Sequence, residues 1–185
     1  LDILAKYGVK ATFFVVNTGA IGTIARAARE GHTIAIHSKT HDYRKIYASE
    51  EAWLEDFWNM QEIIKEQTGD YTSIFRFPGG SSNTVSSFNP GIMSRLTKIM
   101  NDMGYRYFDW NVDSNDAGGA LRAKTVAANV IGGADTHRVS VVLQHDIKGF
   151  SVDAVERILK WGLEHGYSFE ALDMTSPAAQ HKLNN

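Results

Sequence analysis

The chain has 185 residues, of which 43% are hydrophobic and 22% charged, and this balance is ordinary for a globular domain. It holds 19 Lys and Arg residues against 21 Asp and Glu residues, and the resulting net charge of −2 gives no electrostatic reason to bind nucleic acid or an anionic membrane. The absence of Cys excludes thiolate catalysis, Cys-based zinc sites and disulfides, and no apolar run is long enough to insert into a membrane. The length can bury a sizeable core and predicts a single domain over residues 1–185.

The chain opens within a helical pattern and without a Met residue. Leu1, Leu4 and Ala5 keep helical spacing, and Gly8 stands where the residue that ends a helix is expected. We therefore expect a fragment or a trimmed product, whose first helix begins partway through.

From residue 9 onward, short runs rich in β-branched and aromatic residues alternate with helical patterns. The predicted strands are Val9–Val16, Thr33–His37, Tyr71–Phe77, Tyr105–Trp110, Val139–His145 and Tyr167–Leu172. The predicted helices are Ile21–Glu30, Ser49–Gln67, Ile92–Met103, Arg122–Ile131 and Val152–His165. Nearly every helix stops at a glycine shortly before the next strand, which is typical of repeated βα units. The pattern predicts an α/β fold, either an open parallel sheet or a (β/α) barrel with at least one strand missing upstream.

Polar residues follow directly on four of these strands, at the C-terminal ends where parallel α/β folds gather their active sites. The segments are His37–His41, Arg76–Gly80, Asp109–Trp110 and His145–Asp146. We expect them to lie on one rim of the fold.

The spacing of His37 and His41 lets both imidazoles face one metal ion if the segment turns helically after its strand. Two loop histidines without a ligand role fit the same spacing. Structural or solvent roles are expected for the remaining histidines, which are His32, His137, His165 and His181.

Arg76 ends a buried strand and needs a carboxylate or a polar cluster, in a site or in a structural ion pair. The Pro78-Gly79-Gly80 run predicts a tight turn with backbone N–H groups free to point into a cleft. Ser81, which follows, lacks the G-x-S-x-G elbow, so serine hydrolase chemistry is not expected.

Asp109 fits either a cap or a partner for a charged group, and His145 fits either a proton donor or a satisfied rim histidine. Beside a carboxylate, His145 would favour its charged form and suit proton donation.

These residues fall into four ordered motifs: H-[ST]-x-x-H at His37–His41, R-x-P at Arg76–Pro78, D-W at Asp109–Trp110 and L-x-H at Leu143–His145. With them the sequence resembles the polysaccharide deacetylases of the NodB-homology class, carbohydrate esterase family four. The likeness runs over essentially the whole chain, including Lys10–Val15.

The resemblance implies a distorted (β/α) barrel whose first strand is missing from this chain, and hydrolysis of acetyl groups on sugars with a bound divalent metal. His37 and His41 would ligate the metal, with zinc the first candidate and cobalt or nickel the others. His145 would be the general acid, tuned by Asp109, and Arg76 would hold the catalytic base. The Gly79 N–H would help to stabilise the oxyanion, and the substrate-binding set would be Pro78, Gly79, Trp110 and Leu143, the last two around the acetyl methyl group.

The family's T-F-D-D-G motif, which supplies the base and a third metal ligand, is absent from this sequence. We therefore expect weak metal binding and little catalysis from the chain by itself. The nearby carboxylates are Asp42, Asp113 and Asp116.

The leading hypothesis is a metal-dependent deacetylase of N-acetylglucosamine-containing polysaccharide, with peptidoglycan as the first substrate. Two alternatives are an O-acetyl xylan esterase with the same machinery and a non-catalytic, degenerate sugar-binding barrel. A third is a structural fragment whose rim residues have no function in isolation. The resemblance makes an acetylated polysaccharide the partner and places the protein outside the cell or in the cell envelope, while the oligomeric state stays open.

Overall fold

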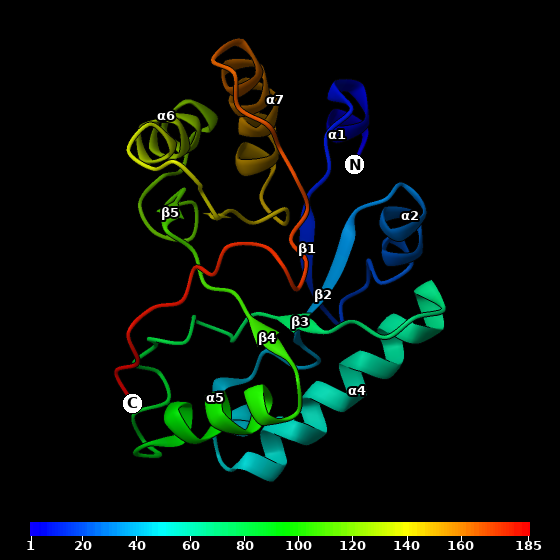
Figure 1. Ribbon diagram of the computed structural model, residues 1–185, viewed down its shortest axis with the longest axis vertical. Helices are drawn as coiled ribbons and strands as arrows, with labels where there is room; N and C mark the ends of the chain where they lie inside the picture. The colour runs from blue at the N-terminus through cyan, green and yellow to red at the C-terminus, as the bar shows by residue number, and fades with distance from the viewer. The chain divides into compact units, whose positions relative to one another are not determined.

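The computed structural model describes residues 1–185 and consists of helices that alternate with short parallel strands (Figure 1). The helices are α1 (Asp2–Tyr7), α2 (Thr23–Arg29), α3 (Tyr43–Ile46), α4 (Glu50–Thr68), α5 (Ile92–Asp102), α6 (Ala123–Ala134) and α7 (Gly149–Glu164). The strands are β1 (Thr12–Val16), β2 (Thr33–Ser38), β3 (Ile74–Phe75), β4 (Arg106–Tyr107), β5 (Val112–Asp113) and β6 (Val142–Leu143). The predicted α/β class is confirmed. None of the helices combines the length and the apolar character that crossing a bilayer requires.

The chain divides into two compact units. The sheet unit comprises Ala11–Asp109 and Ala171–Asn185, and the helix-pair unit comprises Leu1–Lys10 and Trp110–Glu170. The expectation of one catalytic domain over residues 1–185 stays a prediction.

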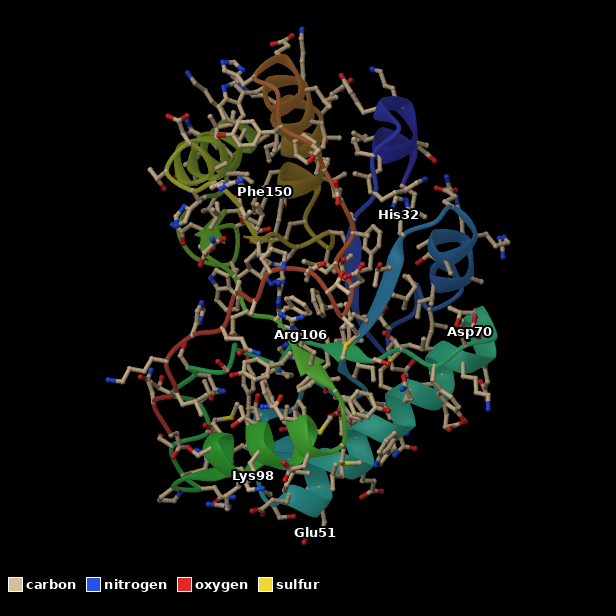
Figure 2. The ribbon with its side chains drawn as sticks, viewed as in Figure 1. His32, Glu51, Asp70, Lys98, Arg106 and Phe150 are labelled. Atoms are coloured by element: carbon tan, nitrogen blue, oxygen red, sulfur yellow. The ribbon has the colours of Figure 1, made fainter.

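The sheet unit is built on parallel strands in the order β1-β2-β3-β4. β1 and β2 are rich in β-branched and aromatic residues, which favour a pleated, half-buried surface, and the two strands pair over most of their length. His32, just before β2, is buried, and its Nδ1 accepts a hydrogen bond from the Ala11 N–H at 3.1 Å (Figure 2). An apolar cluster on this sheet comprises Phe14, Ala35, Ile74, Phe108 and Leu172.

The longest helix, α4, packs its apolar face into an aromatic core beneath the sheet. Trp53 of α4 stacks on Tyr47 with ring centroids 5.8 Å apart, and its ring centroid lies 4.8 Å from that of Phe77. Phe57, one turn further along α4, meets Phe75 edge to face at 5.5 Å. This packing fixes α4 against β2, the strand that ends in the histidine segment.

In the helix-pair unit, α6 packs against α7 (Figure 1). In the same unit, β5 pairs with β6 in parallel. Phe150, at the start of α7, packs against the core of this unit (Figure 2). Gly133 of α6 permits close approach, because a Cβ atom there would lie 2.7 Å from a methyl carbon of Val112. The buried core of this unit consists of small and aliphatic residues, namely Ala120, Val126, Ala127, Val130, Ala154 and Ile158.

All the predicted helices form within a few residues of their expected bounds, and the sequence does not predict α3 or β5. The strand predicted over Tyr167–Leu172 is wrong, since this segment is irregular. The Leu172 N–H donates to the Thr12 hydroxyl at 2.7 Å instead of to a strand carbonyl, while Phe169 turns its side chain into the core of the helix-pair unit.

Candidate active site

The two candidate metal ligands lie at the C-terminal end of β2, in the sheet unit. The Nδ1 atom of His37 is 2.7 Å from the carbonyl oxygen of Arg76. In the tautomer in which Nδ1 donates this hydrogen bond, Nε2 carries the lone pair that a metal ligand needs. His41 follows with a backbone φ of 52°, a left-handed conformation that few non-glycine residues adopt.

The two rings fit a pair of imidazole ligands. Their centroids lie 5.0 Å apart, and their planes are tilted by 54°. Two imidazoles bound to one tetrahedral Zn²⁺ through bonds of about 2.0–2.1 Å place their ring centroids about 5 Å apart, which agrees with the spacing of His37 and His41. Among the described residues, no group of three His, Cys, Asp or Glu side chains is arranged to hold a metal ion. His37 and His41 are therefore a pair of candidate nitrogen ligands, and no third such side chain joins them.

The segment between the two histidines is held by Asp56 of α4, which sequence reasoning missed. The carboxylate of Asp56 is buried and accepts hydrogen bonds from Ser38, Lys39 and Thr40. A signal was present, because Asp56 is an acidic residue on the largely apolar buried face of its helix. Such a residue needs a polar partner, although the helix alone does not say which.

Arg76 follows β3 and is buried, as its place at the end of a buried strand requires. Its Nε donates to the Phe108 carbonyl oxygen, and one Nη donates to the Asp109 carbonyl oxygen, both at 2.8 Å. Burial lowers the pKa of Arg76 to about 10, and the charge of Asp109 opposes this shift. The guanidinium therefore stays charged at neutral pH. Its expected role in holding a catalytic base stays a prediction.

Asp109 also lies in the interior of the sheet unit, with its side chain fully buried. Its carboxylate accepts hydrogen bonds from the backbone and the hydroxyl of Ser81 and from the His181 N–H at 2.9 Å. The Nδ1 of His181 is 3.0 Å from the Ser82 hydroxyl oxygen. Through its N–H, His181 also contacts Asp109, a predicted site residue, although the sequence predicted no site role for this histidine.

The Pro78-Gly79-Gly80 run forms the tight turn that the sequence predicts. Gly79 is exposed, has a φ of 77°, and its N–H donates no hydrogen bond within the chain. The buried Tyr47 hydroxyl donates to the Pro78 carbonyl oxygen at 2.7 Å and fixes the turn. A free N–H on a fixed turn can stabilise developing negative charge on an oxygen atom.

His145 follows β6 in the helix-pair unit and is paired with Asp116. Its Nδ1 lies 2.7 Å from one carboxylate oxygen of Asp116, and its N–H donates to the other at 2.7 Å. The Ser151 hydroxyl donates to the same carboxylate at 2.6 Å. Pairing through Nδ1 makes Nε2 the nitrogen that can exchange a proton with a substrate.

Burial acts to raise the pKa of the Asp116 carboxyl, but the hydrogen bonds from Ser151 and His145 outweigh it and bring this pKa below its ordinary value. Sequence reasoning noted Asp116 only as a nearby carboxylate. Asp116 is the carboxylate in contact with His145, and the tuning of His145 by Asp109 stays a prediction.

The two residues expected around the acetyl methyl group also lie in the helix-pair unit. Leu143 belongs to β6, opposite Asp113 of β5, and Trp110 stands shortly before β5. Both side chains are half-buried. The predicted site residues therefore fall into a set in the sheet unit (His37, His41, Arg76, Pro78, Gly79 and Asp109) and a set in the helix-pair unit (Trp110, Leu143 and His145).

Comparison with known proteins decides the family. The sequence profile of polysaccharide deacetylases matches residues 1–108 of this chain. The chain belongs to the polysaccharide deacetylase family. The matched stretch contains His37, His41 and Arg76.

Curated relatives in this family are longer than the chain. The peptidoglycan-N-acetylglucosamine deacetylase of Bacillus cereus is 32% identical over 179 residues, which cover 92% of this chain and 62% of that protein. The peptidoglycan-N-acetylglucosamine deacetylase PgdA of Listeria monocytogenes is 27% identical, over 94% of this chain and 34% of that protein. The chain thus spans less than two thirds of the length of these polysaccharide deacetylases.

Solved structures confirm the NodB-type α/β fold that the sequence predicts. The catalytic domain of the peptidoglycan N-acetylglucosamine deacetylase from Eubacterium rectale is 53% identical, with a TM-score of 0.97 over 100% of this chain and 86% of that one. The polysaccharide deacetylase Bc1974 from Bacillus cereus is 29% identical, with a TM-score of 0.78 over 96% of this chain and 87% of that one. The hydrogen-bonded sheets of the present chain are open.

Proposed function

We propose that this chain acts in a metal-dependent deacetylase that removes N-acetyl groups from N-acetylglucosamine-containing polysaccharide, with peptidoglycan as the first substrate. The observation that carries the proposal is the 53% identity, over the whole chain, with the Eubacterium rectale catalytic domain. The acetylated polysaccharide is the partner, and the protein works outside the cell or in the cell envelope, where such polymers lie.

His37 and His41 hold the divalent metal, for which zinc is the first candidate and cobalt or nickel the others, because imidazole nitrogen suits all three ions. When bound, such a metal polarises the acetyl carbonyl and makes a water molecule more acidic. The hydrogen bond between His37 Nδ1 and the Arg76 carbonyl oxygen supports this role, since an outer partner on the second ring nitrogen orients a ligating histidine.

The sheet unit also supplies the groups that receive the substrate. The Gly79 N–H donates a hydrogen bond to the oxyanion that forms when the acetyl carbon is attacked. Pro78 precedes this donor and fixes its direction, because the Tyr47 hydroxyl holds the Pro78 carbonyl oxygen. The charged Arg76 orients the carboxylate base, which the family resemblance assigns to the T-F-D-D-G motif that this sequence lacks.

In the helix-pair unit, His145 protonates the leaving amine as the C–N bond breaks. The contact with Asp116 supports this role, because a carboxylate on Nδ1 fixes the ring and leaves Nε2 as the nitrogen that can donate a proton. Leu143 and Trp110 contact the methyl of the acetyl group.

The test is acetate release in the presence of zinc from three substrates: N-acetylglucosamine oligomers, peptidoglycan and O-acetylated xylan. We expect weak release from the first two, because this sequence lacks the T-F-D-D-G motif that supplies the base in the family, and a further loss of about 10²–10⁴-fold in the His145→Ala variant, which is the usual contribution of a general acid. Release from xylan alone would make the chain an O-acetyl esterase. Binding of the oligomers without release from any substrate would make it a sugar-binding barrel.

A further inference from the structure

We propose that Asp56 is a positioning residue for the metal site. Its carboxylate holds the segment from His37 to His41 in the one conformation that presents both imidazoles to the same point. The inference rests on the proposed metal-binding function of the two histidines and assigns a role to a residue that lies outside the family motifs found in the sequence.

The first support is the number and reach of the hydrogen bonds that Asp56 accepts. One carboxylate oxygen accepts from the Ser38 hydroxyl and the Lys39 N–H, both at 2.7 Å. The other accepts from the Thr40 N–H at 2.9 Å and the Thr40 hydroxyl at 2.7 Å. All three residues that separate the two histidines are therefore bonded to a single side chain.

The second support is the backbone of His41. Its φ of 52° is a left-handed conformation, which costs a non-glycine residue free energy and persists only where surrounding contacts impose it. The His41 N–H donates to the Ser38 hydroxyl oxygen at 2.8 Å, and the same hydroxyl donates to Asp56. Asp56 thus fixes the His41 backbone through Ser38.

The third support is that the geometry needs a carboxylate rather than an amide. Two N–H groups and two hydroxyl groups point at Asp56, and an ionised carboxylate only accepts, with two lone pairs on each oxygen. An Asn side chain of the same size would turn an NH₂ group toward two of these donors. Because Asp56 is buried in the face of α4 that carries Trp53 and Phe57, it cannot turn away from the segment.

The experiment measures Co²⁺ binding to the full chain after removal of metal by chelation, by calorimetry and by the visible absorption of the bound ion. The wild type is compared with Asp56→Asn and with Glu66→Gln, which makes the same change of charge at an exposed position of α4. We expect Asp56→Asn to weaken the Kd by about 10–100-fold, which is typical for loss of an outer partner of a metal ligand. Glu66→Gln should bind as the wild type does.

A second variant, Thr40→Val, keeps the shape of the side chain and removes one of the four donors. It should weaken the Kd by a few-fold, and it keeps the test decisive if Asp56→Asn does not fold. Circular dichroism confirms the fold of each variant before the titration. The absorption spectrum separates a misplaced histidine pair from a merely less stable protein, because only the former changes the ligand field of the bound Co²⁺.

The positioning role would be overturned if a folded Asp56→Asn variant bound Co²⁺ with the affinity and spectrum of the wild type. If Asp56→Asn does not fold, the same result in Thr40→Val would overturn it. Either result would leave the proposed function intact. A wild-type chain that binds no Co²⁺, or that binds it as well as His41→Ala does, would overturn the metal-binding function and this inference with it.

Discussion

Arg76 is a charged side chain that lies almost entirely inside the protein. Its guanidinium donates to the carbonyl oxygens of Phe108 and Asp109 and lies over the ring of Phe14, with the guanidinium carbon 4.2 Å from the ring centroid. These contacts make Arg76 a structural residue of the sheet unit in addition to any role toward substrate.

We therefore expect Arg76→Met to lower the free energy of unfolding by about 3–5 kcal/mol, since it leaves two buried carbonyl groups without donors. Arg76→Lys should lose a large part of the same stability, because an ammonium group cannot reproduce the planar fork that bonds both carbonyls. Urea unfolding followed by circular dichroism measures both variants. A loss below about 1 kcal/mol in Arg76→Met would show that these hydrogen bonds contribute little.

The Asp116 carboxyl gives a prediction on pH. Its pKa lies below the ordinary value of 3.8 in the folded protein, so the stabilisation that it contributes is complete above the unfolded value and is lost as the pH falls through the folded one. Ser151→Ala should lower the free energy of unfolding by about 1.5–3 kcal/mol at pH 7, and the difference from wild type should shrink below about pH 4.

The control for Ser151→Ala is Ser140→Ala, because the Ser140 hydroxyl is buried and has no hydrogen-bond partner. It should leave stability unchanged or slightly raised at every pH. A Ser151→Ala effect that stayed constant down to pH 3 would contradict the assigned link to the charge of Asp116.

Some of the candidate site residues could be found from the sequence and others could not. His37 lies at the end of β2, and His41 and Arg76 come shortly after β2 and β3, so their position at a strand end can be inferred from local sequence. Asp56 and Asp116 act on segments at least 16 and 29 residues away in the chain. Which carboxylate reaches a loop over such a separation depends on how helices and loops pack, and no local pattern encodes it.

At the scale of elements, helix α6 carries two adjacent glycines in different surroundings. Gly132 is exposed, and nothing lies within 4 Å of the place where its Cβ would be. A Cβ on Gly133 would lie 2.7 Å from a methyl carbon of Val112 in β5. Substitutions at these two positions therefore test how closely α6 packs against Val112 of β5.

Gly132→Ala should raise the free energy of unfolding by about 0.5–1 kcal/mol, because alanine has the better helix propensity. Gly133→Ala should lower it by about 1–3 kcal/mol, because the methyl group forces α6 and β5 apart. Thermal unfolding of the two variants beside wild type gives the comparison. Equal stabilisation by both would mean that Val112 does not pack against Gly133.

The elements themselves were largely predictable, and for a physical reason. Helices such as α4 and α5 show apolar residues at helical spacing and end beside glycines, and both signals are local. The predicted strand Tyr167–Leu172 has an equally good local pattern but forms no ladder. The Leu172 N–H donates to the Thr12 hydroxyl instead. Which partner this backbone group finds depends on tertiary packing and not on the sequence of the segment.

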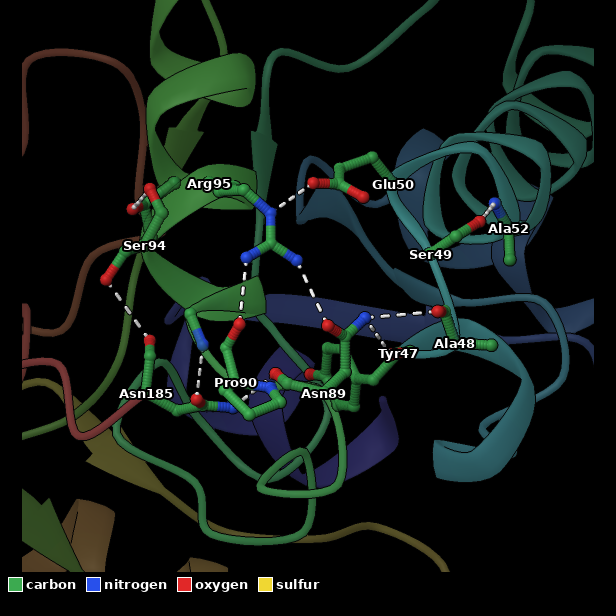
Figure 3. A network of polar contacts seen from close by, with 12 residues as sticks. Tyr47, Ala48, Ser49, Glu50, Ala52, Asn89, Pro90, Ser94, Arg95 and Asn185 are labelled. Carbon is green, nitrogen blue, oxygen red and sulfur yellow. Dashed lines mark hydrogen bonds and ion pairs between the residues drawn. The ribbon is translucent and has the colours of Figure 1, made fainter.

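At the scale of the whole chain, a polar network joins the last residue to segments nearly a hundred positions earlier (Figure 3). The Asn185 side chain accepts from the Gly91 N–H at 2.7 Å and donates to the carbonyl oxygens of Ser86 and Asn89. Arg95 extends the network by bonding to Glu50, Asn89 and Pro90.

Asn185→Ala removes the side chain at the centre of these contacts and should lower the free energy of unfolding by about 1–3 kcal/mol. Lys182→Ala, at an exposed position in the tail formed by residues 177–185, should change the free energy of unfolding by less than about 0.5 kcal/mol. Chemical denaturation compares the two variants. Equal, small effects would show that the tail does not stabilise the sheet unit through Asn185.

The central claim is that this chain supports metal-dependent deacetylation through its histidine pair. The most direct measurement is acetate release from N-acetylglucosamine oligomers by the wild type and by His41→Ala, each after chelation and after readdition of zinc. We predict weak release by the wild type that disappears on chelation and returns with an excess of zinc, and no release by His41→Ala under any condition. Release that survives chelation, or that His41→Ala retains, would contradict the claim, as would the absence of release from the zinc-loaded wild type.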